Sequence, residues 1–238
     1  MKQEGIRKLY RGLLPPLIMR MNNRALMFGV YDNFESLLSC SASSNTSLTI
    51  CHAQAGFLSG ICEAMLCPLE RVQVLLQTSK YHDQFKHTLN AFNQLRDYGY
   101  REYYRGFSVV LLRNGLSNAL YFTLKGPLKQ KVLELLHDTN KPSSAHEIIG
   151  DFVSGAILGA FISTLFFPLG VVKNHMQAKV GVPYDSAIQV FREVWKERNR
   201  SLRGLYLGVH LNFTRSLLAW GIITGMHGVI KRKLAQYE

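Results

Sequence analysis

The sequence has 238 residues, with 28 Lys and Arg against 16 Asp and Glu, a net charge of +12, 47% hydrophobic residues and 18% charged residues. This apolar content excludes intrinsic disorder, and the lack of a G-X-Y period or sustained heptads excludes a collagen-like or coiled-coil chain. A basic excess at low charge density leaves a soluble nucleic-acid-binding protein, or a membrane protein with cations at its helix ends.

Five apolar segments follow one another along the chain. The fourth, Phe152–Val172, contains 21 residues without a charge, and as a helix it would span about 30 Å, the thickness of the hydrocarbon core of a membrane. Arginines interrupt two of the other segments and should face a protein interior or a water-filled cavity. We therefore expect an all-α, multi-pass membrane bundle of about five transmembrane helices. The remaining segments are Leu13–Leu38, Leu48–Leu69, Val109–Leu124 and Ser216–Ile230.

Two charged stretches between these segments have apolar residues at helical spacing. Lys86–Arg96 and Tyr184–Arg198 each carry one apolar face, so we predict short helices that lie on a membrane surface. The same stretches would fit the surface of a soluble domain. No basic run interleaved with exposed aromatics supports nucleic-acid binding, and we expect no nucleic-acid partner.

The sequence contains no pattern typical of an enzyme, a metal site or a bound cofactor. Cys40, Cys51, Cys62 and Cys67 form no C-x-x-C and have no histidines at zinc spacing, so we interpret them as small buried thiols in a reducing compartment. The histidines are scattered, and no G-x-G-x-x-G motif is present. We therefore expect no catalytic residues, no metal and no resident cofactor.

A repeat of about one hundred residues runs through the chain. Cys67–Gln77 (CPLERVQVLLQ) is similar to Phe167–Gln177 (FPLGVVKNHMQ). Pairs of glycines precede both copies, a spacing that lets helices approach closely. The repeat divides the chain into residues 1–40, 41–138 and 139–238, and only the first unit is partial. The glycine pairs are Gly56/Gly60 and Gly155/Gly159, and the Tyr-Arg-Gly element of the repeat ends at Gly12 and Gly106, with a degenerate copy at Gly208.

This pattern resembles the mitochondrial carrier family over nearly the whole chain. The family signature has a helix-breaking proline, an acid two residues later, a base five later and a glutamine nine later. The resemblance implies a six-helix barrel of three repeats in the mitochondrial inner membrane, and this chain supplies five of the helices, without the first. A transport-incompetent fragment is therefore an alternative. The matching residues are Pro68, Glu70 and Gln77 in one copy, and Pro168, Lys173 and Gln177 in the other.

Carriers of this family work by alternating access, with ion pairs that close each side in turn. The resemblance implies a matrix gate formed by Glu70 and Lys173 and braced by Gln77 and Gln177. Gln73 and Gly170 depart from the pattern, so only one matrix pair can form. At the cytosolic side the aligned motifs begin at Tyr31, Lys125 and His227. There the family expects an aromatic residue, an acid and a base, and only Asp32 with Lys129 forms a pair.

Three arginines suggest the substrate. Arg20 lies eight residues after its repeat glycine, and Arg113 and Arg215 each lie seven after theirs, so we expect three guanidinium groups at one depth. Guanidinium groups bind phosphate oxygens in pairs, which implies a phosphorylated anion. Asn114 could bond a base edge, and Gly115 could leave room for a flat ring. Arg24, Asn22 and Asn23 are further candidates to line the cavity.

Segments such as LRNGLSNALYF and RSLLAWGII resemble the subgroup of the family that contains the mitochondrial NAD carrier. This implies import of NAD or a related dinucleotide as transported substrate, with another nucleotide-like anion such as coenzyme A as the alternative. It also implies a monomer with the lipid bilayer, including cardiolipin, as its surroundings.

Overall fold

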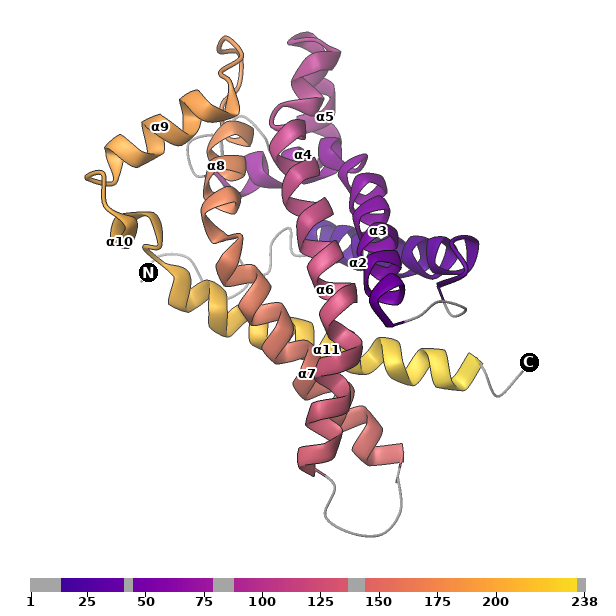
Figure 1. Cartoon of the computed structure of the whole chain (residues 1–238). Helices are drawn as coiled ribbons and strands as arrows, with labels where there is room; N and C mark the ends of the chain where they lie inside the picture. Colours follow the sequence, from indigo (N-terminus) through magenta and orange to yellow (C-terminus); the bar gives the residue numbers. More distant parts are fainter. Residues whose placement is uncertain (1–13, 41–44, 79–87, 137–143, 235–238) are drawn as a thin grey trace, which may run out of the picture.

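The computed structural model describes residues 14–40, 45–78, 88–136 and 144–234, and side chains over 21–40, 49–78, 88–135 and 146–234. Within these ranges every regular element is a helix (Figure 1), as the sequence predicts. The long helices are α2 (Leu14–Leu37), α3 (Asn45–Ala64), α6 (Phe107–Leu136), α7 (Ser144–Leu165) and α11 (Val209–Leu234). The shorter ones are α4 (Cys67–Gln77), α5 (Thr88–Asp97), η3 (Tyr100–Tyr104), α8 (Phe167–Gln177), α9 (Ala187–Glu197) and α10 (Leu202–Leu205).

Helices α3 and α7 each end just before a proline. Pro68 and Pro168 lie in the first turns of α4 and α8. Backbone N–H groups of a first turn have no acceptor within the helix, so the missing N–H group of proline costs no hydrogen bond there. The axes of α3 and α4 differ by 60°. The charge-free segment 152–172 is likewise divided at Phe166 into α7 and α8 rather than forming one straight helix.

The two complete repeats have the same build. In each, a helix that ends before the proline packs along the next long helix: α3 along α6, and α7 along α11. The glycine pairs allow this approach, because a Cβ on Gly60 would lie 2.6 Å from the Cα of Gly115, and a Cβ on Gly159 would collide with Trp220. This confirms the predicted close packing. Contacts between α6 and α7 join the two repeats.

The short surface helices are also where the sequence predicts them. Helices α5 and α9 pack on α4 and α8 respectively, and Figure 1 shows α9 beside α8 at one end of the bundle. A capping box starts α9, since the Ser186 hydroxyl accepts from the backbone N–H of Ile188 and the Gln189 side chain accepts from the backbone N–H of Ser186. Gly106 and Gly208 have positive φ angles (81° and 88°) at the turns into α6 and α11, which explains why glycine ends the repeat element.

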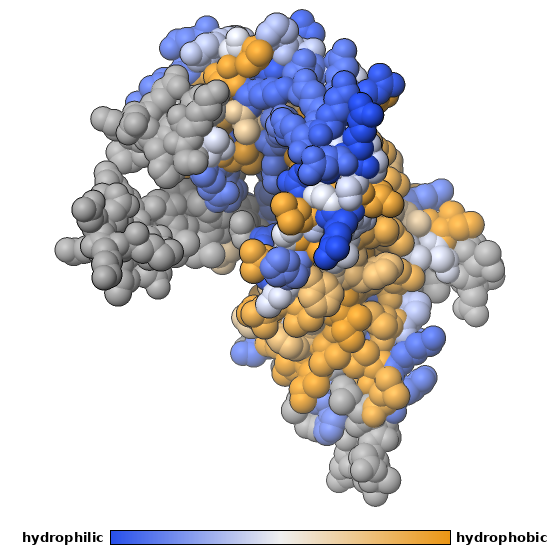
Figure 2. Space-filling view, turned by 90° about the vertical axis from the view of Figure 1, so that its left-hand side faces the viewer, coloured by the Kyte–Doolittle hydropathy of each residue, from blue (hydrophilic) through white to orange (hydrophobic). Residues whose placement is uncertain are grey.

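Hydrophobic side chains cover the flank of the bundle below the polar end. Figure 2 shows this as an orange surface beneath a blue one. Several exposed residues of α7 and α11 are large and apolar, and a lipid surround would cover them. By length and hydropathy, one described helix (His146–Leu165) can cross a membrane, and α3 with α4 passes the same test as a bent pair. Exposed examples are Ile157, Phe161 and Leu165 on α7, and Leu218, Ile222 and Met226 on α11.

The prediction of four reduced cysteines is wrong for two of them. Cys40 and Cys51 form a disulfide that joins the end of α2 to the first part of α3, with 5.6 Å between their Cα atoms. The short connection between these helices brings together two residues that are eleven positions apart. Cys62 and Cys67 are free thiols.

Candidate functional site

A cavity of about 570 Å³ lies at the centre of the described bundle, between the helices of both repeats. We call it the arginine cavity, because three arginines from three helices line it: Arg24 of α2, Arg113 of α6 and Arg215 of α11. The described lining also includes one more base, Lys173, and two acids, Glu63 and Glu70. Basic side chains therefore outnumber acidic ones in this lining.

Arg113 and Arg215 lie in the same cavity, as their equal distance from the repeat glycines predicts. The Arg113 guanidinium donates to the Asn114 side chain at 3.4 Å, and its buried Nε has no hydrogen-bond partner. Arg215 donates to Asn212 at 3.0 Å. Arg20 belongs to α2, but its side chain lies outside the described residues.

Of the additional candidates on α2, Asn23 and Arg24 line the arginine cavity, and Asn22 does not. The Arg24 guanidinium stacks on the Trp220 ring, 4.2 Å from its centroid. Because Trp220 also lines the cavity, this cation–π contact holds Arg24 at the cavity wall.

Gly115 does not line the cavity, so its predicted role as room for a flat ring is wrong. A Cβ on this residue would lie 2.7 Å from the Phe57 ring of α3. Residues 114 and 115 point in different directions on α6, and only Asn114 reaches the cavity. Gly115 instead permits the close crossing of α3 and α6.

Sequence reasoning missed a second polar pair in the arginine cavity. Asn118 donates to the buried carboxylate of Glu63 at 3.0 Å, and both residues line the cavity. In the sequence Glu63 merely interrupts an apolar segment. The spacing of Asn114 and Asn118, one helical turn apart, is the signal that could have indicated a polar stripe on α6.

Glu70 and Lys173 meet at the end of the arginine cavity where α4 and α8 approach each other. The Lys173 ammonium lies 3.2 Å from a Glu70 carboxylate oxygen, and the two side chains are only 12% and 17% exposed. The predicted glutamine braces do not contact this pair. Gln177 donates to the Cys67 sulfur at 3.7 Å instead, and Gln77 lines the cavity with an exposed side chain.

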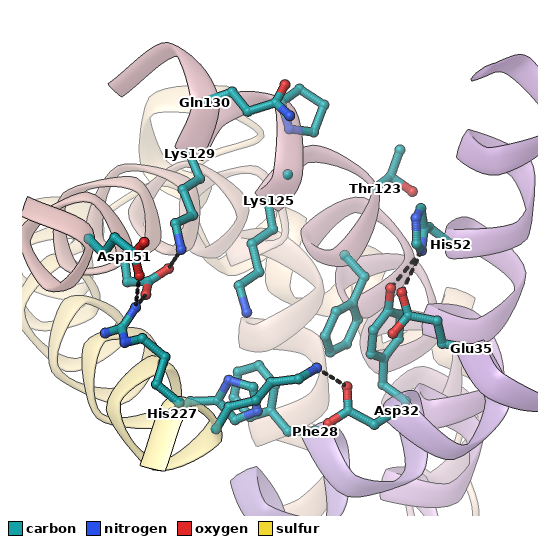
Figure 3. Close-up of a pocket in the computed structure, with 18 of the residues that line it drawn as sticks. Phe28, Asp32, Glu35, His52, Thr123, Lys125, Lys129, Gln130, Asp151 and His227 are labelled. Atoms are coloured by element: carbon teal, nitrogen blue, oxygen red, sulfur yellow. Dashed lines mark hydrogen bonds and ion pairs between the residues drawn. The ribbon is translucent and has the colours of Figure 1, made fainter. Parts of the chain in front are cut away.

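A second cavity, of about 750 Å³, lies at the other end of the long helices (Figure 3). We call it the lysine cavity, after Lys125, Lys129 and Lys231 in its lining. Among the described lining residues, the number of acidic side chains equals the number of lysines and arginines, since four acids accompany these three lysines and Arg232. The acids are Asp32, Glu35, Glu147 and Asp151.

The predicted pair of Asp32 with Lys129 is not formed. Lys129 instead lies 2.7 Å from Asp151 of α7, and Asp32 lies 3.2 Å from Lys231 of α11. The reason is the packing of α6 against α7, which brings a carboxylate from outside the repeat motif to Lys129. Arg232 also binds Asp151 at 3.0 Å.

A buried layer of aromatic side chains separates the two cavities. Phe28, Tyr31 and Phe122 line the lysine cavity, and their cluster also contains Ile162, which lines the arginine cavity. Tyr121 continues the layer, because its ring packs on Trp220 at 4.8 Å. Movement of a solute between the cavities would require these rings to shift.

A buried ionic cluster joins the repeats at the end nearer the arginine cavity, and no sequence motif predicted it. Arg71 and Arg105 both pair with Glu102. Arg105 also donates to the backbone carbonyls of Val182 and Pro183 in the third repeat. These contacts fix the segment after α8 against α4 and η3.

The same segment carries a surface cluster centred on Lys179. Its ammonium donates to Glu193 at 2.9 Å and to Asp185 at 3.0 Å. These hydrogen bonds hold the pKa of Lys179 above its usual value. The hydrogen bond from Lys179 to Glu193 tethers α9 to the segment after α8.

Comparisons with known proteins agree on one family. The family "Mitochondrial carrier protein" matches residues 1–42, 46–135 and 144–238. The human mitochondrial nicotinamide adenine dinucleotide transporters SLC25A51 and SLC25A52 are each 44% identical over 227 residues, which is 95% of this chain and 74% of theirs. Human solute carrier family 25 member 53 is 33% identical, over 97% of this chain and 74% of its own.

Proposed function

The chain belongs to the mitochondrial carrier family, and from this premise we propose that it imports NAD, or a related dinucleotide, into the matrix by alternating access. The observation that carries the proposal is the arginine cavity, where guanidinium groups from three helices line one central space. The 44% identity to transporters named for this dinucleotide supports the same substrate. The chain is thus a transporter and not an enzyme.

The pyrophosphate is the part of the substrate that the arginines would hold. Arg113 and Arg215 line the cavity from α6 and α11, and a planar guanidinium offers two parallel N–H groups to phosphate oxygens. Arg20 would be the third member of this set. The Asn114 side chain, beside Arg113, would bond the edge of a base.

Closure on the matrix side would depend on Glu70 and Lys173. This pair joins α4 to α8, so that breaking it would free the two helices beyond the proline breaks at Pro68 and Pro168. Gln77 lines the same cavity. On the cytosolic side the ion pairs of Asp32 and Lys129 with their observed partners, Lys231 and Asp151, would close the path.

The family implies the mitochondrial inner membrane for this chain. We further propose a multi-pass arrangement in which α2, α6 and α11, and the bent pairs α3–α4 and α7–α8, cross the bilayer. The apolar flank in Figure 2 supports contact with lipid, for which cardiolipin is a candidate, and we propose a monomer. The three matched segments support repeats at 1–40, 41–138 and 139–238.

Uptake of labelled NAD into liposomes that contain the purified protein tests this proposal. We expect uptake by the wild type and a loss of at least about hundredfold for Arg113→Gln, since two charge-assisted hydrogen bonds of about 1.5 kcal/mol each would be lost. Arg192→Gln makes the same charge change on exposed α9 and should transport normally. Wild-type uptake by the Arg113 variant would refute the assignment of the site.

Competition separates NAD from other anions. Unlabelled NAD should inhibit the uptake of labelled NAD more strongly than coenzyme A or ATP at equal concentration. Stronger inhibition by coenzyme A would indicate that the arginine cavity binds coenzyme A rather than NAD as its substrate.

A further inference from the structure

Lys125 differs from the other lysine and arginine side chains in the lysine cavity. Lys129, Lys231 and Arg232 each lie within 3.2 Å of a carboxylate oxygen. Lys125 makes no ion pair with any described residue, although it points into the same cavity between these pairs (Figure 3). It occupies the position of the repeat motif where an aromatic residue is expected.

The neighbouring carboxylates are already engaged elsewhere. Asp151 holds Lys129 and Arg232, and Asp32 holds Lys231. Glu35 lies 3.5 Å from His52, which is itself hydrogen-bonded to the Tyr31 hydroxyl. An anion that entered the cavity would therefore meet one ammonium group that forms no ion pair with a described acid.

Aromatic rings hold the Lys125 ammonium in place without using its donors. Its Nζ lies 5.1 Å from the centre of the Phe28 ring and 5.9 Å from that of Tyr121. A cation–π contact of this kind leaves the N–H groups available to oxygen acceptors. The Phe28 ring is covered on one side by His227, stacked at 4.0 Å, so the ammonium lies beside the aromatic layer.

From this arrangement we propose that Lys125 binds a phosphate group of the nucleotide in the lysine cavity before the substrate passes the aromatic layer. The proposal rests on the proposed function and adds a second, outer binding position to it. The balanced charges of the lysine cavity make this position weaker than the arginine cavity. Weak binding suits a site that must release its ligand inward.

Initial rates of NAD uptake as a function of external NAD test this role. Lys125→Gln should raise KM about tenfold, the effect of one lost charge-assisted hydrogen bond, with a maximal rate within about twofold of wild type. Lys125→Arg, which keeps the charge, should restore most of the affinity. Lys131→Gln changes the charge at an exposed position of the same helix outside the cavity, and its KM should not change.

Two results would overturn the proposal. One is an unchanged KM for Lys125→Gln; the other is an equal loss for Lys125→Arg and Lys125→Gln with lowered melting temperatures, which would indicate a packing role. Raising the salt concentration should increase KM for the wild type more than for Lys125→Gln, because salt screens the charge that the variant lacks.

A binding assay tests the phosphate-binding role of Lys125 independently of NAD transport. In a background that carries both Arg113→Gln and Arg215→Gln, millimolar pyrophosphate should still raise the melting temperature of the purified protein, because a ligand of the folded state stabilises it. Adding Lys125→Gln should remove this shift, and Lys131→Gln should keep it. An undiminished shift in the Lys125 variant would refute the outer site, whereas absent NAD uptake by the wild type would refute only the substrate.

Discussion

The arginine cavity and the lysine cavity are lined by the same long helices, α2, α3, α6, α7 and α11, but they balance their charges differently. In the lysine cavity, Asp32 of α2 and the two acids of α7 pair with bases of α6 and α11, and Glu35 of α2 lies beside His52 of α3. In the arginine cavity, Glu63 is bonded to Asn118 and Glu70 to Lys173. No described carboxylate there pairs with Arg113.

This difference assigns separate tasks to the two ends. A cavity whose ion pairs are internally satisfied can hold helices together and open when the pairs separate. A cavity with surplus guanidinium groups attracts an anionic ligand. The family pattern explains part of the surplus, because Gly170 stands where an acid is expected, and a Cβ there would lie 3.8 Å from the Arg113 Nε.

The largest effect should come from making the arginine cavity resemble the lysine cavity. Gly170→Asp would add a carboxylate within reach of Arg113, and this internal ion pair would compete with the substrate phosphate. We expect NAD uptake to fall about hundredfold, as for the loss of two charge-assisted hydrogen bonds. Uptake into liposomes measures it.

Two matched glycine variants give this comparison its controls. Gly170→Ala adds only a Cβ at an ordinary contact distance and should transport normally. Gly126→Asp adds the same charge to the lysine cavity, where a Cβ has open space, and should reduce uptake by no more than about tenfold, because the Lys125 ammonium that it could engage contributes one charge-assisted hydrogen bond. Equal losses for the two aspartate variants would mean that the cavities do not differ as described.

The fold was largely predictable because its signals are local. A proline in an apolar segment indicates that a new helix begins there, and a pair of glycines indicates a closely packed neighbouring helix. Both kinds of prediction are confirmed, at Pro68 and Pro168 for the helix starts and at Gly60 and Gly159 for the close contacts. The equal spacing of Arg113 and Arg215 from the repeat glycines also predicted that they share one cavity, since equal spacing along a helix gives equal rotation about its axis.

The errors concern partners, which depend on how whole helices face each other. Lys129 pairs with Asp151 because of the rotation of α6 against α7, and no motif records that rotation. Gln177 likewise turns toward Cys67 rather than toward Lys173. The Cys40–Cys51 bond depends on the turn between α2 and α3, which a count of cysteine spacings does not reveal.

An intermediate effect should follow from breaking the ion pair at the arginine cavity. Glu70→Gln leaves the mostly buried Lys173 ammonium unpaired, and we expect a loss of about 2 kcal/mol, or a melting temperature lowered by about 4–8 °C. The exchange Glu70→Lys with Lys173→Glu should recover at least half of this loss. Thermal unfolding of the purified protein in detergent measures both, and an exchange variant no better than the single one would argue against a direct pair.

The smallest effect belongs to the matching experiment at the lysine cavity. Asp32 and Lys231 also lie 3.2 Å apart, but their side chains are 40% and 63% exposed, against 17% and 12% for Glu70 and Lys173. Water and salt screen such a pair, so Asp32→Asn should cost about 0–1 kcal/mol and lower the melting temperature by less than about 3 °C. The same distance with different burial isolates the role of solvent. If Asp32→Asn destabilised the protein as much as Glu70→Gln, burial would not be what distinguishes the ion pairs at the two ends.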